Sequence, residues 1–151
     1  MNSAKIFACV SLLIILQLFL TNAPRAQSTP QNLVLAFIEA YNVQDVDQML
    51  AMVAADIRWM NVDGVRIRLQ TVGKEALGSG MRGYFDNLPS ARAEVRDIRQ
   101  LDDFVTVVEA ALWEANGVAQ SQCAISVYQV ADGLISNVWY YPARQCESTS
   151  D

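Results

Sequence analysis

Two sharp turn signals, Asn116-Gly117 and Asp132-Gly133, limit the possible folds of this chain more than any other part of its sequence. Asn-Gly and Asp-Gly readily adopt the positive φ angles that two-residue β-hairpin turns require. The segments that lie between and beside these turns are rich in β-branched and other apolar residues, as strands are. They span residues 91–100, 104–115, 118–130 and 134–141. The sequence therefore predicts consecutive antiparallel strands in its C-terminal half.

The region before these strands has a helical pattern. Apolar residues at helical spacing, or a helix-capping residue, mark three segments at residues 30–41, 45–53 and 73–88. Two short strands are predicted between the second and third helices, at residues 56–61 and 65–69. Helices that come first and strands that come last predict an α+β fold, in which helices cover one face of a curved sheet.

Residues 1–26 have the pattern of a secretory signal peptide. Lys5 supplies a positive charge, residues 6–20 are apolar apart from two polar positions, and the following residues are small and polar. The apolar run is shorter than the ~20 residues that cross a membrane, which favours cleavage over a membrane anchor. We therefore predict a secreted or periplasmic protein without a membrane partner. The remaining chain divides into a linker (27–31), one domain (32–142) and a C-terminal tail (143–151).

The charge and the cysteine and histidine content of the chain indicate which partners, covalent links and metal ions to expect. Cleavage would remove Lys5 and Arg25 and would change 11 basic and 16 acidic residues to 9 and 16, a net charge of −7. This sign disfavours nucleic acid as a partner. Cys123 and Cys146 would remain, and in an exported protein such a pair indicates a disulfide, the alternative being two free thiols. The chain has no His, the commonest metal ligand, and we expect no metal site and no cofactor.

Several short phrases occur along the chain in a characteristic order. They are Phe37-Ile38-Glu39-Ala40-Tyr41-Asn42 with Asp45-Val46-Asp47, Ala55-Asp56-Ile57-Arg58-Trp59, Gly73-Lys74-Glu75-Ala76-Leu77, and Val127-Tyr128-Gln129-Val130 before Asp132-Gly133. Together they resemble the SnoaL-like branch of the nuclear-transport-factor-two-like superfamily. The resemblance implies a cystatin-like α+β barrel: a cone-shaped, curved antiparallel sheet with three N-terminal helices packed on its concave face. It also implies a pocket and, because many relatives dimerise through the sheet, a homodimer.

The resemblance does not specify a reaction, because the superfamily includes isomerases, cyclases, epoxide hydrolases, dehydratases and non-catalytic modules. Where steroid-isomerase relatives have a helix tyrosine and two strand aspartates, this chain has Phe37, Asn61, and Ile125 or Ser126. The general base and both oxyanion donors of that reaction are therefore missing.

Strand alternation predicts which side chains face the pocket. If Ala115 faces Val118 and Ala131 faces Leu134, every second residue shares a face. One face then mixes polar groups with aromatics, as ligand pockets do, and holds Val107, Glu109, Trp113, Gln122, Ser126, Asn137, Trp139 and Tyr141. The other face is small and aliphatic, suits the core or a contact between two copies, and holds Val108, Ala110, Leu112, Cys123, Ile125, Val127 and Val138.

Glu109 is the predicted catalytic residue. A carboxylate is costly to bury in the middle of a strand, so a buried Glu109 must find a donor or take up a proton, and a raised pKa would suit general acid–base chemistry. The alternative is an ion pair with an arginine, or a side chain that faces solvent. The predicted ligand-binding residues are Phe37, Trp59, Asn61, Tyr84, Trp113, Gln122, Ser126, Trp139 and Tyr141. The sequence thus supports two hypotheses: a pocket for a small, largely apolar molecule, or a non-catalytic dimerising module with a vestigial pocket.

Overall fold

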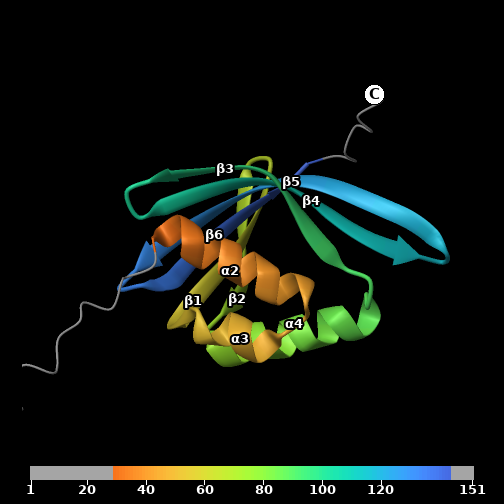
Figure 1. The fold of residues 1–151 in the computed structure, drawn as a ribbon, viewed down its shortest axis with the longest axis horizontal. Coiled ribbons are helices and arrows are strands. Elements are labelled where there is room, and N and C mark those ends of the chain that lie inside the picture. Colours follow the sequence, from red (N-terminus) through yellow and green to blue (C-terminus); the bar gives the residue numbers. More distant parts are fainter. Residues whose placement is uncertain (1–28, 144–151) are drawn as a thin grey trace, which may run out of the picture.

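The computed structural model describes residues 29–143, and its elements follow the predicted order (Figure 1). The helices are α2 (Pro30–Asn42), α3 (Val46–Ala51) and α4 (Lys74–Asn87). The strands are β1 (Val53–Asp63), β2 (Arg66–Val72), β3 (Arg92–Leu101), β4 (Phe104–Ala115), β5 (Val118–Ala131) and β6 (Leu134–Pro142). The α+β prediction is confirmed. The predicted signal peptide, and the predicted tail beyond residue 143, lie outside the described residues.

The strands form one curved sheet in the order β2-β1-β6-β5-β4-β3. Both hairpin turns form as predicted, with φ of 54° and 75° at Asn116 and Gly117 and 52° and 74° at Asp132 and Gly133. One pair departs from the predicted antiparallel sheet, because β1 and β6 run parallel. This pair joins strands from opposite ends of the domain, and local turn signals carry no information about the relative direction of such strands.

The three helices lie on the same side of the sheet (Figure 1). Thr29 and Asp45 accept hydrogen bonds from backbone N–H groups and so cap the first two helices. The core is formed by apolar side chains from all three helices and from the inner face of the sheet, among them Phe37, Met49 and Leu77. None of the helices in the described part of the chain is both long and apolar enough to cross a membrane.

The pairing of β4 with β5 matches the register predicted from the first hairpin. Ala115 pairs with Val118, and Glu109 pairs with Ala124. As a result, alternate residues of these two strands face the helices as expected. This pairing is the basis for placing Glu109 on the inner face.

The faces predicted for β6 are wrong. Gln129 pairs with Asn137 but Val130 pairs with Ile135, so that Ser136 is an extra residue in a β-bulge. A one-residue shift turns every later side chain of the strand to the opposite face. Ser126 therefore pairs with Tyr140 where the turn had predicted Trp139.

The corrected faces of β6 agree with the burial of its side chains. Val138, which was predicted to face away from the helices, is completely buried in the core. Trp139, which was predicted to face inward, has its ring 6.4 Å from that of Phe104, a residue that is 42% exposed. Asn137 and Tyr141 share the face of Trp139, on the outer side of the sheet.

Candidate functional site

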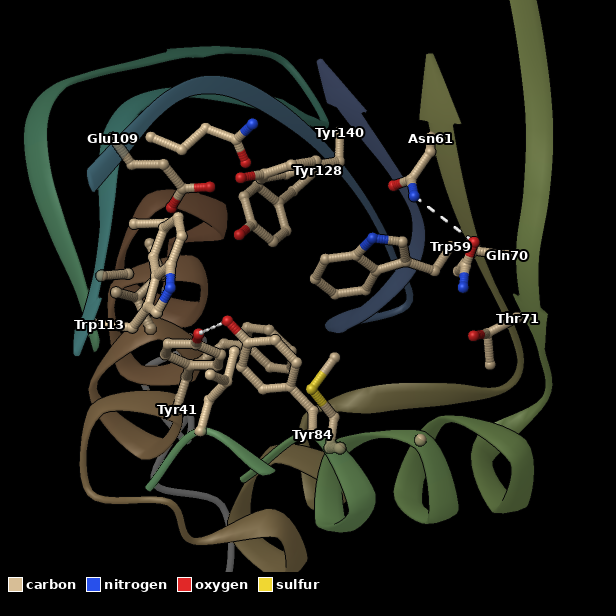
Figure 2. Close-up of a pocket in the computed structure, with 18 residues that line it drawn as sticks. Tyr41, Trp59, Asn61, Gln70, Thr71, Tyr84, Glu109, Trp113, Tyr128 and Tyr140 are labelled. Carbon is tan, nitrogen blue, oxygen red and sulfur yellow. Dashed lines mark hydrogen bonds between the residues drawn. The ribbon is translucent and has the colours of Figure 1, made fainter. Parts of the chain in front are cut away.

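A cavity of about 500 Å³, open to solvent at one end, lies between the helices and the inner face of the sheet (Figure 2). Most of its lining is apolar or aromatic, and a few polar groups interrupt it, as is usual for small-molecule pockets. The residues of the predicted site that line it are Phe37, Trp59, Asn61, Tyr84, Glu109, Trp113 and Gln122. That these residues bind a ligand remains a prediction.

The other three predicted site residues lie elsewhere. Ser126 is fully buried behind the cavity wall, where it contacts Glu109. Trp139 and Tyr141 face the outer side of the sheet because of the bulge in β6 and do not line the cavity. Their place is taken by Tyr140, whose inward direction could not be read from the turn signal.

Glu109 is 5% exposed, and its carboxyl lies in the cavity wall. The hydroxyl of Ser126 donates a hydrogen bond to its Oε1. The ion pairs among the described residues join other side chains, so the predicted alternative of an arginine partner is not found there. Burial raises the pKa of Glu109, and the hydrogen bond from Ser126 lowers it by a smaller amount. Glu109 therefore keeps its proton to a higher pH than an exposed glutamate does.

Two tyrosines lie beside this carboxyl, and a third, Tyr41, lies farther along the cavity wall. Tyr128 of β5 and Tyr140 of β6 point toward Glu109 in Figure 2, and Tyr41 of α2 donates a hydrogen bond of 3.3 Å to the hydroxyl of Tyr84. Burial and, in smaller part, the charge of Glu109 raise the pKa of Tyr140 to about 12. Burial also raises the pKa of Tyr41 and Tyr128 further above their ordinary value, aided mainly by Tyr84 at Tyr41 and by the charge of Glu109 at Tyr128. These hydroxyls are therefore neutral hydrogen-bonding groups.

Sequence reasoning missed Tyr128 and Tyr140 as members of the site. Tyr128 could have been found, because it shares the inward face of Ser126 two residues earlier on the same strand. The helical spacing of residues 30–41 places Tyr41 on the apolar face of that helix and gives no sign of a role in the cavity. Tyr140 has no comparable local signal, since its direction depends on the bulge.

Aromatic side chains form the apolar walls of the cavity. The ring of Phe37 lies 6.4 Å from that of Trp59 and 6.2 Å from that of Tyr128. Trp113 extends from β4 beside the carboxyl of Glu109 (Figure 2). Such rings offer a large apolar contact area to a bound molecule.

Strand β5 forms hydrogen bonds with Ala143, the residue that follows β6. The N–H of Ala143 donates to the carbonyl of Cys123 at 2.8 Å, and the side-chain amide of Gln122 donates to the carbonyl of Ala143 at 3.3 Å. Cys123 is disulfide-bonded. Cys146, its predicted partner, lies outside the described residues, so the predicted pairing is untested.

Comparisons with known proteins identify the architecture. A family model described as SnoaL-like domain matches residues 34–138, whereas no curated protein matches the chain. An uncharacterized cystatin-fold protein from Novosphingobium aromaticivorans is 25% identical, with a TM-score of 0.68 over 75% of this chain and 97% of that one. IdmH, a putative polyketide cyclase from Streptomyces antibioticus, is 21% identical, with a TM-score of 0.63 over 76% and 92%. An LEH-like epoxide hydrolase from M. tuberculosis is 18% identical, with a TM-score of 0.63 over 76% and 82%. The last two likenesses concern the fold alone.

Proposed function

This chain belongs to the SnoaL-like domain family, and from that premise we propose that it is an exported domain that binds a small, uncharged, largely apolar molecule in its cavity. Any catalysis is acid–base chemistry on that molecule, with Glu109 as the proton carrier. The proposal of export rests on the pattern of residues 1–26.

The observation that carries this proposal is the buried carboxyl of Glu109 in the wall of an aromatic cavity. A core that needed only stability would place an apolar side chain there, because burying a carboxyl group is costly. Ser126 satisfies one carboxyl oxygen, whereas the other, Oε2, has no hydrogen-bond partner among the described residues. That oxygen is available to a molecule in the cavity.

The charge of the lining defines the kind of molecule. Within the described residues, the lining contains one carboxyl group and no lysine or arginine. A bound anion would find no cation, and the protonated form of Glu109 gives little attraction to a ligand cation. An uncharged molecule with a hydrogen-bond acceptor for the protonated carboxyl fits best.

The same geometry defines the chemistry of a proton transfer. Glu109 gives its proton to the ligand, and the hydroxyl of Ser126 stabilises the carboxylate that remains. The protonated ligand loses a proton from a different atom to water, which balances the transfer, and the solvent then returns a proton to Glu109. The ring hydroxyls of Tyr128 and Tyr140 hold the reacting group in place, and Asn61 and Gln122 supply further polar contacts. Neighbours of this fold include a putative polyketide cyclase, a putative hydroxylase and an epoxide hydrolase, which supports an organic molecule as the occupant.

N-phenyl-1-naphthylamine, an uncharged apolar fluorophore, tests whether the cavity takes such a molecule. We expect saturable binding at one site in a fluorescence titration. Ala111→Trp fills the cavity from β4 and should weaken binding at least about tenfold, which is about 1.4 kcal/mol. Ala119→Trp, at an exposed position of β5, is the matched control and should bind as the wild type does.

Circular dichroism of both variants shows whether each is folded. Equal affinity of folded Ala111→Trp and wild-type protein would place the fluorophore outside the cavity. An absence of saturable binding to the wild-type protein would contradict the proposed ligand site.

The outer face of the sheet favours a second role, as an association surface. Val108 pairs with Ile125, Ile125 pairs with Tyr141, and these three apolar side chains are 37%, 45% and 40% exposed. A continuous exposed apolar face of this kind indicates a protein contact. We propose that two copies associate through it.

Native mass spectrometry tests this association and also detects a retained small molecule. We expect a dimer for the wild type and a monomer for Ile125→Asp, since a charge at the centre of the contact has no partner. Val65→Asp, at a position 97% exposed in the β1–β2 turn, should remain dimeric. A monomeric wild-type protein would contradict the proposal.

A further inference from the structure

A β-bulge at the mouth of the cavity turns two neighbouring side chains inward. Trp59 pairs with Thr71 but Met60 pairs with Leu69, so Gln70 is an extra residue in β2. Neighbouring residues of a regular strand point to opposite faces, and a bulge breaks that alternation. Gln70 and Thr71 consequently both line the cavity. Bulges are frequent beside functional sites because they redirect a side chain in this way.

The bulge completes a group of three uncharged polar side chains, Asn61, Gln70 and Thr71, which we call the rim. The amide of Asn61 donates to Oε1 of Gln70 over a long 3.5 Å (Figure 2). In the described part of the chain, Nε2 of Gln70, Oδ1 of Asn61 and the hydroxyl of Thr71 have no other hydrogen-bond partner. The rim therefore offers both donors and acceptors to a molecule in the cavity.

The rim lies at the opposite end of the cavity from Glu109. In Figure 2 the carboxyl of Glu109 and the ring of Tyr140 lie on one side, the rim lies on the other, and the indole of Trp59 extends between them. Glu109 is buried, whereas Gln70 is exposed, so the rim is at the open end. Polar groups thus stand at both ends of an aromatic middle section.

We propose that the rim is a second polar subsite, and that it selects uncharged aromatic molecules that carry a hydrogen-bonding group at each end. One polar end meets the carboxyl of Glu109 and the other meets Gln70, which acts as a specificity-determining residue. The inference rests on the proposed function, because it requires that the cavity takes a ligand. It goes further in assigning a role to Gln70 and Thr71 and in requiring a second polar group on the ligand.

Two pairs of phenols of different length test the subsite by isothermal titration calorimetry. Each pair compares one hydroxyl with two: biphenyl-4-ol with biphenyl-4,4′-diol, and 2-naphthol with 2,6-naphthalenediol. We expect the wild-type protein to bind the diol of at least one pair about tenfold more tightly, well above the roughly twofold that two equivalent orientations provide. Gln70→Leu, of similar size, should bind both members of that pair within about twofold while keeping the affinity for the mono-ol.

Gln48→Leu, an exposed change on α3, is the matched control and should keep the preference for the diol. Equal affinities for mono-ol and diol in the wild-type protein, or a preference that survives in Gln70→Leu, would overturn the subsite and leave the proposed function standing. Binding of N-phenyl-1-naphthylamine without binding of any phenol would also overturn it. Failure of all these probes to bind would overturn the proposed function itself.

Discussion

We expect Glu109→Gln to be more stable than the wild-type protein at neutral pH, and equally stable below the ordinary glutamate pKa of 4.5. The substitution keeps the size of the side chain and an oxygen that accepts the hydrogen bond from Ser126. It removes only the ability to ionise. Urea unfolding curves measured between about pH 4 and pH 8 report the difference directly.

The sign of this stability difference follows from burial, which raises the pKa of Glu109 in the folded state. As the pH rises above 4.5, the unfolded chain loses this proton first, while the folded protein still holds it. The free energy of unfolding therefore falls with pH until the folded-state pKa is passed, by about 1.4 kcal/mol for each unit of pKa difference. Glutamine does not ionise, so the variant lacks this loss.

Glu114→Gln is the matched control, because Glu114 lies on the same strand with an exposed side chain. It should leave the difference between neutral and acidic pH unchanged. If the unfolding free energies of Glu109→Gln and wild type instead run parallel over the whole pH range, the carboxyl of Glu109 is not held in its protonated form by burial.

A second large effect is expected at Val138. This side chain is completely buried, and its residue pairs with Tyr128 on the inner face of the sheet. Val138→Asp places a carboxyl among apolar groups without a partner, at a cost of several kcal/mol, comparable to the whole stability of many domains. Circular dichroism should show a largely unfolded protein at neutral pH.

Tyr141→Asp, on the same strand but 40% exposed on the outer face, should cost the single chain about 1 kcal/mol or less, so that it remains folded even if it no longer associates with a second copy. The comparison tests the bulge in β6. Without the bulge, Val138 would face outward and Tyr141 inward, and the two variants would exchange their effects.

The acidic residue of this cavity, Glu109, occupies a different position from the aspartates of the steroid-isomerase relatives. Where steroid-isomerase relatives have a helix tyrosine and a first-strand aspartate, this chain has Phe37 and Asn61, and both line the cavity. The carboxyl comes from Glu109 on β4 and is hydrogen-bonded to Ser126 on β5. Strand alternation predicted the inward direction of both of these residues.

Features that depend on neighbouring residues could be predicted from the amino-acid sequence. Asn-Gly and Asp-Gly adopt the positive φ angles of hairpin turns, and a period of two then orients Glu109, Trp113 and Gln122 inward along β4 and β5. Helical spacing likewise placed Phe37 and Tyr84 on apolar helix faces. These signals act over a few residues, so they can be interpreted without knowledge of the rest of the fold.

Features that depend on pairing between distant segments could be assigned only from the three-dimensional fold. No local sequence signal predicts the parallel pairing of β1 with β6. The same holds for the extra residues Gln70 and Ser136 in the two bulges. Each bulge is a one-residue difference between two strands, set by how both pack against the helices and against each other. For that reason the sequence predicted the acid in the cavity wall but not Tyr140 beside it, nor the rim at the mouth.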